Sequence, residues 1–279
     1  MNLKPGDSVL DATVGGGGHA LEILKKISPG GHLLGIDWDK GAIERAEKKL
    51  AKYKNSVILK QGNYTDAKKI SYGSRNNQFS AILLDLGLSR DQLEDESRGF
   101  SFQNLGSLDM RFSDQGELTT SEIVNTWPED DLTHIFRVYG EERHAARVAK
   151  LIVSTRERAP IESVPELVAL VMRGVGGRGK RHPATRIFQA LRIATNRELE
   201  NIEKALPDLV GLLKKSGRLG VITFHSLEDR IVKQYFKPLA RSENPPIKLI
   251  NKKVIKPKYE EVKRNPAARS AKLRIVEKA

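Results

Sequence analysis

Short apolar runs alternate with amphipathic segments along the first 90 residues of the chain. Four of these runs have the length of buried strands: residues 8–12, 32–37, 56–60 and 79–86. Between them, residues 21–27 and 40–52 place their apolar side chains at helical spacing. Strands that alternate with helices in this way are typical of parallel β-α-β units, so the pattern predicts a doubly wound α/β sheet.

The pattern changes after the fourth run. Residues 87–116 are rich in Gly, Ser and Asp and have no clear period, which predicts a long loop. Residues 117–195 show only helical spacing, and Ser163 and Pro165 mark the start of one helix. We therefore predict an all-helical insertion over residues 117–195.

The sheet pattern returns at residue 196. Residues 196–215 predict a helix that Gly217 ends, residues 218–224 predict a strand, and residues 272–276 predict a final edge strand. The α/β domain is therefore discontinuous in the sequence. It comprises residues 1–116 and 196–279.

A glycine-rich loop joins the first predicted strand to the first predicted helix. It matches the dinucleotide-binding pattern G-x-G-x-x-[GA] as Gly15-x-Gly17-x-x-Ala20. Asp37 ends the second strand, 19 residues beyond Gly18, where a carboxylate can accept hydrogen bonds from a ribose diol. The pattern predicts an adenosine cofactor, and NAD and S-adenosylmethionine both satisfy it. The alternative is a structural glycine turn, with Asp37 capping the next helix.

The composition narrows the possible chemistry. The chain contains no cysteine, which excludes disulfide scaffolds, cysteine-ligated zinc or iron–sulfur sites and thiol catalysis. It has no H-E-x-x-H or other metal-ligand spacing, so we expect no metal site. No apolar run approaches the ~18 residues of a membrane span, and Met1–Asp7 do not form a signal peptide. We therefore expect a soluble, cytoplasmic protein without a membrane partner.

The net charge of +13 is concentrated in two segments. Residues 136–197 hold 13 basic and 5 acidic side chains, and residues 241–279 hold 12 basic and 4 acidic ones. Each segment has a net charge of +8, and the rest of the chain has −3. A localised positive field suggests a polyanionic partner such as nucleic acid, with a merely soluble basic surface as the alternative.

Seven motifs, in order along the chain, decide between the two cofactors. They are DATVGGGGH at 11–19, LLDLGLSRDQ at 83–92, RGFSF at 98–102 with LDMR at 108–111, YGEER at 139–143, HPATRIFQALRIATNREL at 182–199, FHSLEDRIV at 224–232 and NPAARSAKLRI at 265–275. With them the sequence resembles, from Val9 to Val276, the bacterial 16S ribosomal RNA (cytosine-N4)-methyltransferases, also called MraW. The resemblance implies a Rossmann-like class I methyltransferase fold. It also implies S-adenosylmethionine-dependent methylation of the exocyclic N4 of one cytosine in the decoding region of the small subunit.

The resemblance further implies a donor site made of Gly17, Gly18, His19, Asp37, Tyr64, Asp85 and Gln92. In this site Gly17–His19 line the methionine end, Asp37 holds the ribose and Tyr64 lies near the adenine. Asp85 and Gln92 surround the reacting methyl group. The chain departs from the family pattern at its start, which lies almost at the first strand where relatives have a short extra segment.

Methyl transfer from a sulfonium is an in-line displacement, which needs the nucleophile about 3–3.5 Å from the methyl carbon. Cytosine N4 is a poor nucleophile, and acceptors for its two N–H bonds favour the reaction. Asp85 lies at the carboxyl end of the fourth strand, where open α/β sheets bind ligands, and is the first catalytic candidate. Asp109 is the second. The alternative for Asp85 is a helix cap or a cofactor contact without a chemical role.

The target base must leave its helix or loop to be reached. Phe100 and Phe102 can stack on it, with anchoring of a loop in the core as the alternative. A basic loop in the insertion supplies candidate RNA contacts: Arg178, Lys180, Arg181, His182 and Arg186. For His182 the alternative is a cap before the next helix. These residues make the insertion the candidate RNA-recognition subdomain.

Two other functions stay open on the sequence alone. A non-catalytic ribosome-binding factor on the same fold is compatible with the short start of the chain. An NAD-dependent oxidoreductase matches the glycine pattern but gives no reason for two basic segments.

His225, Ser226 and Asp229 suggest a hydrolase triad, but the G-x-S-x-G elbow is missing from the sequence. The expected partner is 16S rRNA in the small ribosomal subunit, and the oligomeric state is open, with a homodimer as one option.

Overall fold

The computed structural model describes residues 1–72, 78–176 and 182–279. The chain forms two compact units. We call them the sheet unit, Met1–Gly87 with Leu199–Ala279, and the helical unit, Leu88–Glu198.

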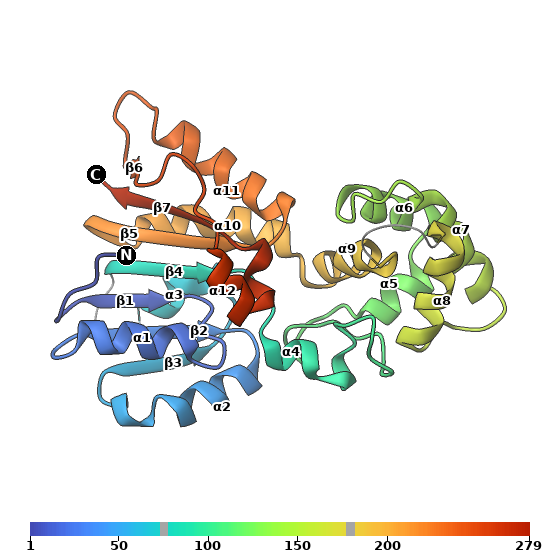
Figure 1. Cartoon of the computed structure of the whole chain (residues 1–279), viewed down its shortest axis with the longest axis horizontal. Coiled ribbons are helices and arrows are strands. Elements are labelled where there is room, and N and C mark those ends of the chain that lie inside the picture. Colours follow the sequence, from blue (N-terminus) through green and yellow to red (C-terminus); the bar gives the residue numbers. More distant parts are fainter. Residues whose placement is uncertain (73–77, 177–181) are drawn as a thin grey trace. The chain divides into compact units, whose positions relative to one another are not determined.

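The sheet unit contains seven strands in the order β3-β2-β1-β4-β5-β7-β6 (Figure 1). They are β1 Ser8–Asp11, β2 His32–Asp37, β3 Val57–Gln61, β4 Phe79–Asp85, β5 Leu213–Thr223, β6 Ile247–Leu249 and β7 Lys272–Lys278. Strands β1 to β5 pair in parallel, and β7 runs antiparallel to both β5 and β6. The predicted doubly wound α/β sheet is confirmed.

Helices cover both faces of this sheet (Figure 1). The helices and short 3-10 turns of the unit are α1 Gly18–Ile27, α2 Lys40–Lys49, η1 Ala51–Tyr53, η2 Tyr64–Asp66, α3 Ala67–Ser71, α10 Glu198–Gly211, α11 Ser226–Leu239, α12 Tyr259–Arg264 and η4 Pro266–Ser270. Adjacent residues of a strand point to opposite faces. Leu33 belongs to the core beside α1 and α2, whereas Leu34 belongs to the core beside α10 and α11. Burial on both faces explains why the strands are continuous apolar runs.

The structure corrects two predicted elements in the second half of the sheet. The helix predicted to reach residue 215 ends at Gly211, and β5 begins at Leu213, which already pairs with Phe79. The predicted edge strand, β7, is internal. On this side of the sheet the edge strand is β6, whose three residues are too few to give an alternating pattern in the sequence.

The helical unit has its own core. Its elements are α4 Arg90–Glu94, η3 Glu96–Arg98, α5 Thr120–Thr126, α6 Glu129–Val138, α7 Ala145–Arg156, α8 Val164–Val175 and α9 Ala184–Asn196. As the sequence predicts, α8 follows Ser163 and has Pro165 in its first turn. Phe100, Leu108 and Met110 are buried in the same core as these helices, so the preceding loop segment belongs to this unit. None of the helices in the described ranges is long and apolar enough to cross a membrane.

Candidate active site

Three carboxylates lie at the carboxyl ends of neighbouring strands in the sheet unit. β1 lies between β2 and β4, and Asp11 is in register with Gly35 of β2 and Leu83 of β4. Asp37 and Asp85 each follow two residues further along their strands. The three carboxylates therefore surround the start of the loop that leaves β1. We call Asp11, His19, Asp37, Tyr64 and Asp85 the strand-end site.

Asp37 holds the glycine loop. Gly17, at the turn into α1, has φ +79°, and a Cβ at this residue would stand 3.4 Å from Ala46. The Asp37 carboxylate accepts hydrogen bonds from the Gly15 N–H at 2.8 Å and the Asp39 N–H at 2.9 Å. Burial raises the pKa of Asp37 despite these hydrogen bonds. Asp39, not Asp37, caps α2, and each Asp37 oxygen can accept a further hydrogen bond, as a ribose diol requires.

Asp11 is a member of this site that the sequence reasoning did not list. Its side chain is fully buried. Oδ1 accepts a hydrogen bond from the Thr13 N–H at 3.4 Å, and Oδ2 is buried with no partner among the described residues. Burial raises the pKa of Asp11 from 3.8 to about 7, His19 opposes the rise, and Asp85 adds to it. The signal in the sequence is a carboxylate that ends an apolar strand directly before a glycine loop.

Asp85 and His19 form a pair at the rim of the site. The Asp85 N–H donates to Thr13 Oγ1 at 2.7 Å, which ties the ends of β1 and β4 together. Asp85 Oδ2 lies 3.2 Å from His19 Nε2, and this hydrogen bond is the main reason why the pKa of His19 is raised. Asp85 Oδ1 is buried and has no partner in the described part of the chain. The site thus holds two buried carboxylate oxygens for which the described residues supply no hydrogen-bond donor.

These oxygens fit a positively charged ligand. A buried carboxylate oxygen without a donor is costly, and a cationic or N–H group that binds there removes the cost. S-adenosylmethionine carries an ammonium and a sulfonium. NAD instead carries a pyrophosphate, which three neighbouring carboxylates would repel. The residues of the strand-end site therefore fit S-adenosylmethionine better than NAD.

Tyr64 follows the end of β3, which pairs with the end of the strand that carries Asp37. The Gly62 N–H donates to the Asp37 carbonyl oxygen at 2.9 Å, which holds the end of β3 against β2. Asn63 then accepts a hydrogen bond from the Thr65 N–H at 3.0 Å and starts η2. Tyr64 itself is half-buried against the sheet core. The structure therefore brings Tyr64, Asp37 and the glycine loop together in one unit.

Gln92 is the remaining residue predicted to bind S-adenosylmethionine. It lies in the helical unit and is 9% exposed. It forms a reciprocal cap with Ser89. The Ser89 N–H donates to Gln92 Oε1 at 3.0 Å, and the Gln92 N–H donates to Ser89 Oγ at 3.1 Å. The side chain of Gln92 therefore fixes the start of α4.

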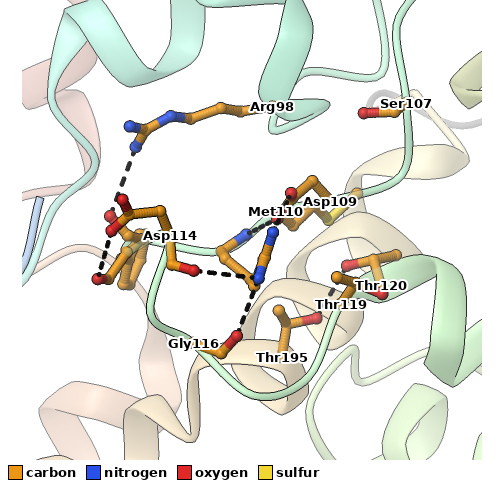
Figure 2. A network of polar contacts seen from close by, with 12 residues as sticks. Arg98, Ser107, Asp109, Met110, Asp114, Gly116, Thr119, Thr120 and Thr195 are labelled. Atoms are coloured by element: carbon orange, nitrogen blue, oxygen red, sulfur yellow. Dashed lines mark hydrogen bonds and ion pairs between the residues drawn. The ribbon is translucent and has the colours of Figure 1, made fainter.

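Asp109 anchors a polar network in the helical unit (Figure 2). Arg111 donates to both carboxylate oxygens, through Nε at 2.8 Å and Nη2 at 2.9 Å. Its Nη1 donates to the Gly116 carbonyl oxygen at 2.9 Å and closes the loop. Partial burial opposes ionisation, but the hydrogen bonds from Arg111 outweigh it and lower the pKa of Asp109. An ionised carboxylate with both oxygens paired is a weak proton acceptor, which favours a structural role over the predicted catalytic one.

The two predicted stacking residues have different surroundings. Phe100 is 6% exposed and stacks on Phe112 with ring centroids 5.5 Å apart, which suits the anchoring alternative. Phe102 is half-buried and meets Phe188 edge-on. It also stacks on the exposed His182 ring, with centroids 4.4 Å apart and planes 3° apart. The Phe102–His182 pair thus keeps an aromatic ring at the surface of the helical unit.

The structure describes two of the five residues predicted to contact RNA, His182 and Arg186. His182 Nδ1 accepts a hydrogen bond from the Ala184 N–H at 3.2 Å, at the start of α9. Arg186 is exposed and its Nη1 lies 3.6 Å from Glu142 Oε2. The other three predicted contacts lie outside the described residues: Arg178, Lys180 and Arg181.

The His225, Ser226 and Asp229 set belongs to the start of α11. His225 precedes the helix as its cap, in a reciprocal arrangement with Glu228. The Asp229 carboxylate accepts hydrogen bonds from Arg274 Nε at 2.7 Å and Nη2 at 3.2 Å. These contacts account for the motif without a hydrolytic triad.

Comparisons with known proteins point in one direction. The MraW methylase family matches residues 1–279. The ribosomal RNA small subunit methyltransferase H of Coprothermobacter proteolyticus is 49% identical over 269 residues, which cover 96% of this chain and 89% of that protein. The proteins of the same name from Thermomicrobium roseum and Carboxydothermus hydrogenoformans are 44% and 43% identical. These alignments cover 99% and 100% of this chain and 89% and 94% of those proteins.

Proposed function

The chain belongs to the MraW methylase family, and from this premise we propose that it transfers the methyl group of S-adenosylmethionine to the ribosomal RNA of the small subunit. The target is the exocyclic N4 of one cytosine in the decoding region, as the motifs of the sequence imply. One observation supports S-adenosylmethionine as the methyl donor. Two buried oxygens, Asp11 Oδ2 and Asp85 Oδ1, receive no hydrogen bond from the described residues. An rRNA substrate places the enzyme in the cytoplasm.

Each residue of the strand-end site has a role that follows from its contacts. Asp37 accepts hydrogen bonds from the ribose while it holds the glycine loop. Tyr64, next to Asp37, packs beside the adenine. Asp11 and Asp85 supply negative charge for the cationic end. When bound, S-adenosylmethionine supplies a methyl group on a positively charged sulfur, so that the leaving group departs neutral.

Asp85 is the group best placed to act on the target amine. Its side chain is 23% exposed, whereas Asp11 is fully buried. His19 Nε2 holds the carboxylate through Oδ2, and the carboxylate can accept an N–H of the cytosine amine and direct the amine lone pair in line with the methyl carbon. Positive charge develops on N4 as its bond to carbon forms, and the carboxylate stabilises that charge. After the transfer, N4 loses one proton to solvent water, which leaves neutral N4-methylcytosine and neutral S-adenosylhomocysteine.

Calorimetric titration tests the choice of donor. We expect binding of S-adenosylmethionine and no measurable heat with NAD, because the strand-end carboxylates repel a pyrophosphate. Binding of NAD alone would overturn the proposed donor. The oxidoreductase hypothesis would then take its place.

Transfer of tritiated methyl groups tests the reaction itself. Small ribosomal subunits that lack the modification and protein-free 16S rRNA are incubated with the enzyme, and the labelled nucleosides are separated. We expect the label in N4-methylcytidine. Donor binding without any label on either RNA would instead identify a non-catalytic ribosome-binding factor. Label on the free RNA alone would place the reaction before subunit assembly.

The Asp85→Asn variant separates a catalytic role from a cofactor contact. We expect single-turnover methylation at saturating donor to fall at least about 100-fold, since the amide cannot stabilise the developing charge. The kinetic readout is combined with calorimetric donor binding. A full rate at saturating donor would leave Asp85 as a cofactor contact only.

A further inference from the structure

A cationic groove lies in the sheet unit between the second half of α11 and the β6–β7 edge. Its volume is about 620 Å³. Its positively charged lining residues are Lys233, Lys237, Arg241, Lys248, Lys252 and Arg274. No Asp or Glu of the described chain lines it. We call this feature the α11 groove.

The positive charge of the α11 groove is not neutralised within the described chain. Arg274 is the exception, because Asp229 accepts its hydrogen bonds. Glu277 lies opposite Lys248 in the strand pair, but its carboxylate accepts a hydrogen bond from Arg218 at 2.9 Å. The other five cations are exposed and take part in no ion pair among the described residues. An anion that binds here meets five uncompensated charges.

The spacing of these charges favours a polyanion over a single small anion. Lys233, Lys237 and Arg241 follow one another at intervals of four residues along α11 and the turn after it. Four residues of helix rise about 6 Å, so the charges form a row along one face of the helix. A polyanion with regularly repeated negative charges can contact every cation in such a row, whereas one phosphate ion cannot.

The far wall of the α11 groove is ordered before any ligand binds. Asn251 Oδ1 accepts a hydrogen bond from the Ile275 N–H at 2.7 Å, and its Nδ2 donates to the Leu273 carbonyl oxygen at 3.1 Å. Ile255 and Leu273 exchange backbone hydrogen bonds at 3.1 and 2.8 Å. These contacts fix the turn that carries Lys252. A fixed turn lowers the entropic cost of binding.

The α11 groove extends along α11 from Arg274, which pairs with Val221 near the carboxyl end of β5, to β6. α11 begins after the carboxyl end of β5 and runs back along the sheet for 14 residues (Figure 1). A helix of this length spans about 20 Å. The α11 groove shares no residue with the strand-end site, and β5 and β7 separate β6 from the strand that carries Asp85. We therefore expect a ligand in the groove to affect affinity and not the chemical step.

We propose that the α11 groove binds the sugar–phosphate backbone of the rRNA substrate and so positions the subunit from the side of the sheet unit. The proposal rests on the proposed rRNA methyltransferase function. It assigns an RNA contact to the α11 groove of the sheet unit, in addition to the predicted contacts of the helical unit. The floor of the α11 groove is apolar and includes the buried Phe236 and Ile247.

The test compares two triple variants with equal loss of charge. The groove variant is Lys233→Gln, Lys237→Gln and Lys252→Gln. The control variant is Lys48→Gln, Lys49→Gln and Lys52→Gln, three exposed lysines of α2 and η1. Binding of each protein to protein-free 16S rRNA and to small subunits is measured by fluorescence anisotropy over a series of salt concentrations. Methylation kinetics and calorimetric donor binding are measured in parallel.

We expect the groove variant to keep its donor affinity and its kcat while its KM for the small subunit rises at least about tenfold. The slope of log K against log salt should fall by about 2 for the groove variant, because each lost phosphate contact removes 0.7–0.9. Equal KM and salt slopes for the two variants would overturn the proposal. Loss of binding to subunits but not to 16S rRNA would also overturn it and point to an acidic ribosomal protein. An inactive wild-type enzyme would refute the proposed function and leave the RNA-binding comparison readable.

Discussion

Asp109 in the helical unit and the carboxylates of the strand-end site differ in how their oxygens are paired by hydrogen bonds. In the helical unit, Arg111 donates to both oxygens of Asp109. In the strand-end site, Asp11 and Asp85 each keep a buried oxygen for which the described chain supplies no donor. Buried polar atoms are nearly always paired, and exceptions need a reason. The comparison therefore separates a carboxylate that holds a loop from carboxylates that we propose pair with the bound S-adenosylmethionine.

The same contrast appears in the pKa values. Burial raises the pKa of Asp11 to about 7, whereas hydrogen bonds from Arg111 overcome burial and lower the pKa of Asp109. The pairing with Arg111 therefore favours the ionised form of Asp109. Asp11 changes its charge near neutral pH, and a cationic ligand favours its ionised form.

The largest expected effect is that of Asp37→Ala on donor affinity. The variant loses the acceptor for the ribose and the hydrogen bond to the Gly15 N–H that holds the loop. Hydrogen bonds to a charged group contribute about 1.5–3 kcal/mol each, so we expect a loss of a few hundred-fold, about 3–4 kcal/mol. Calorimetric titration with S-adenosylmethionine measures it.

Asp39→Ala is the matched control for this prediction. Asp39 lies two residues away and caps α2 through the Gly41 N–H at 2.9 Å. Loss of this cap should lower the free energy of unfolding by about 1 kcal/mol and leave donor affinity unchanged. Equal donor affinities for the two variants would remove Asp37 from the ribose site.

The second prediction concerns the pH dependence of stability. The pKa of Asp11 is raised in the folded chain, so its protonated form favours folding. The contribution of Asp11 to the free energy of unfolding is therefore complete below about pH 4 and is lost as the pH rises to about 7. Asp11→Asn removes this titration. We expect the variant to gain stability over the wild-type protein by roughly 1 kcal/mol per pH unit between pH 5 and 7. Urea unfolding at several pH values measures the difference.

The groups that face Asp11 allow a control. His19, Asp37 and Asp85 act on its charge, and the pKa of His19 is itself raised. His19→Gln removes the histidine titration. The change of unfolding free energy with pH that remains in this variant is therefore due to the carboxylates. A constant difference between Asp11→Asn and wild type across the pH range would mean that Asp11 stays ionised in the folded chain.

Sequence reasoning predicted the frame of the site better than its charge. The apolar runs located β1, β2 and β4, and spacing from the glycine loop identified Asp37. The burial of Asp11 was not predicted, because it depends on strands that are distant in the sequence. The Asp109–Arg111 pair was also missed, since two residues in an irregular loop have no period that predicts a contact. Local patterns specify strands and turns, whereas the protonation of a carboxylate depends on tertiary packing.

The third prediction tests the structural side of the comparison. Asp109→Asn and Arg111→Ala each break the same bidentate pair, so each should lower the free energy of unfolding by about 1 kcal/mol. The double variant should cost less than the sum of the two. Donor affinity should stay within twofold. If Asp109→Asn keeps full stability but loses methylation in single turnover, then Asp109 belongs to the catalytic machinery and the contrast with Asp85 fails.

The smallest expected effect separates the two roles of His182, whose ring stacks on Phe102 and whose Nδ1 accepts a hydrogen bond from Ala184, the first residue of α9. His182→Asn keeps a capping acceptor and removes the ring, whereas His182→Phe keeps the ring and removes the acceptor. If a base of the substrate stacks on this ring, the Asn variant should bind 16S rRNA about fivefold more weakly, about 1 kcal/mol, at unchanged stability. The Phe variant should bind RNA normally and lose about 1 kcal/mol of stability. Normal RNA binding by both variants would leave His182 with the cap alone, and the helical unit would then recognise RNA through charge rather than through an aromatic surface.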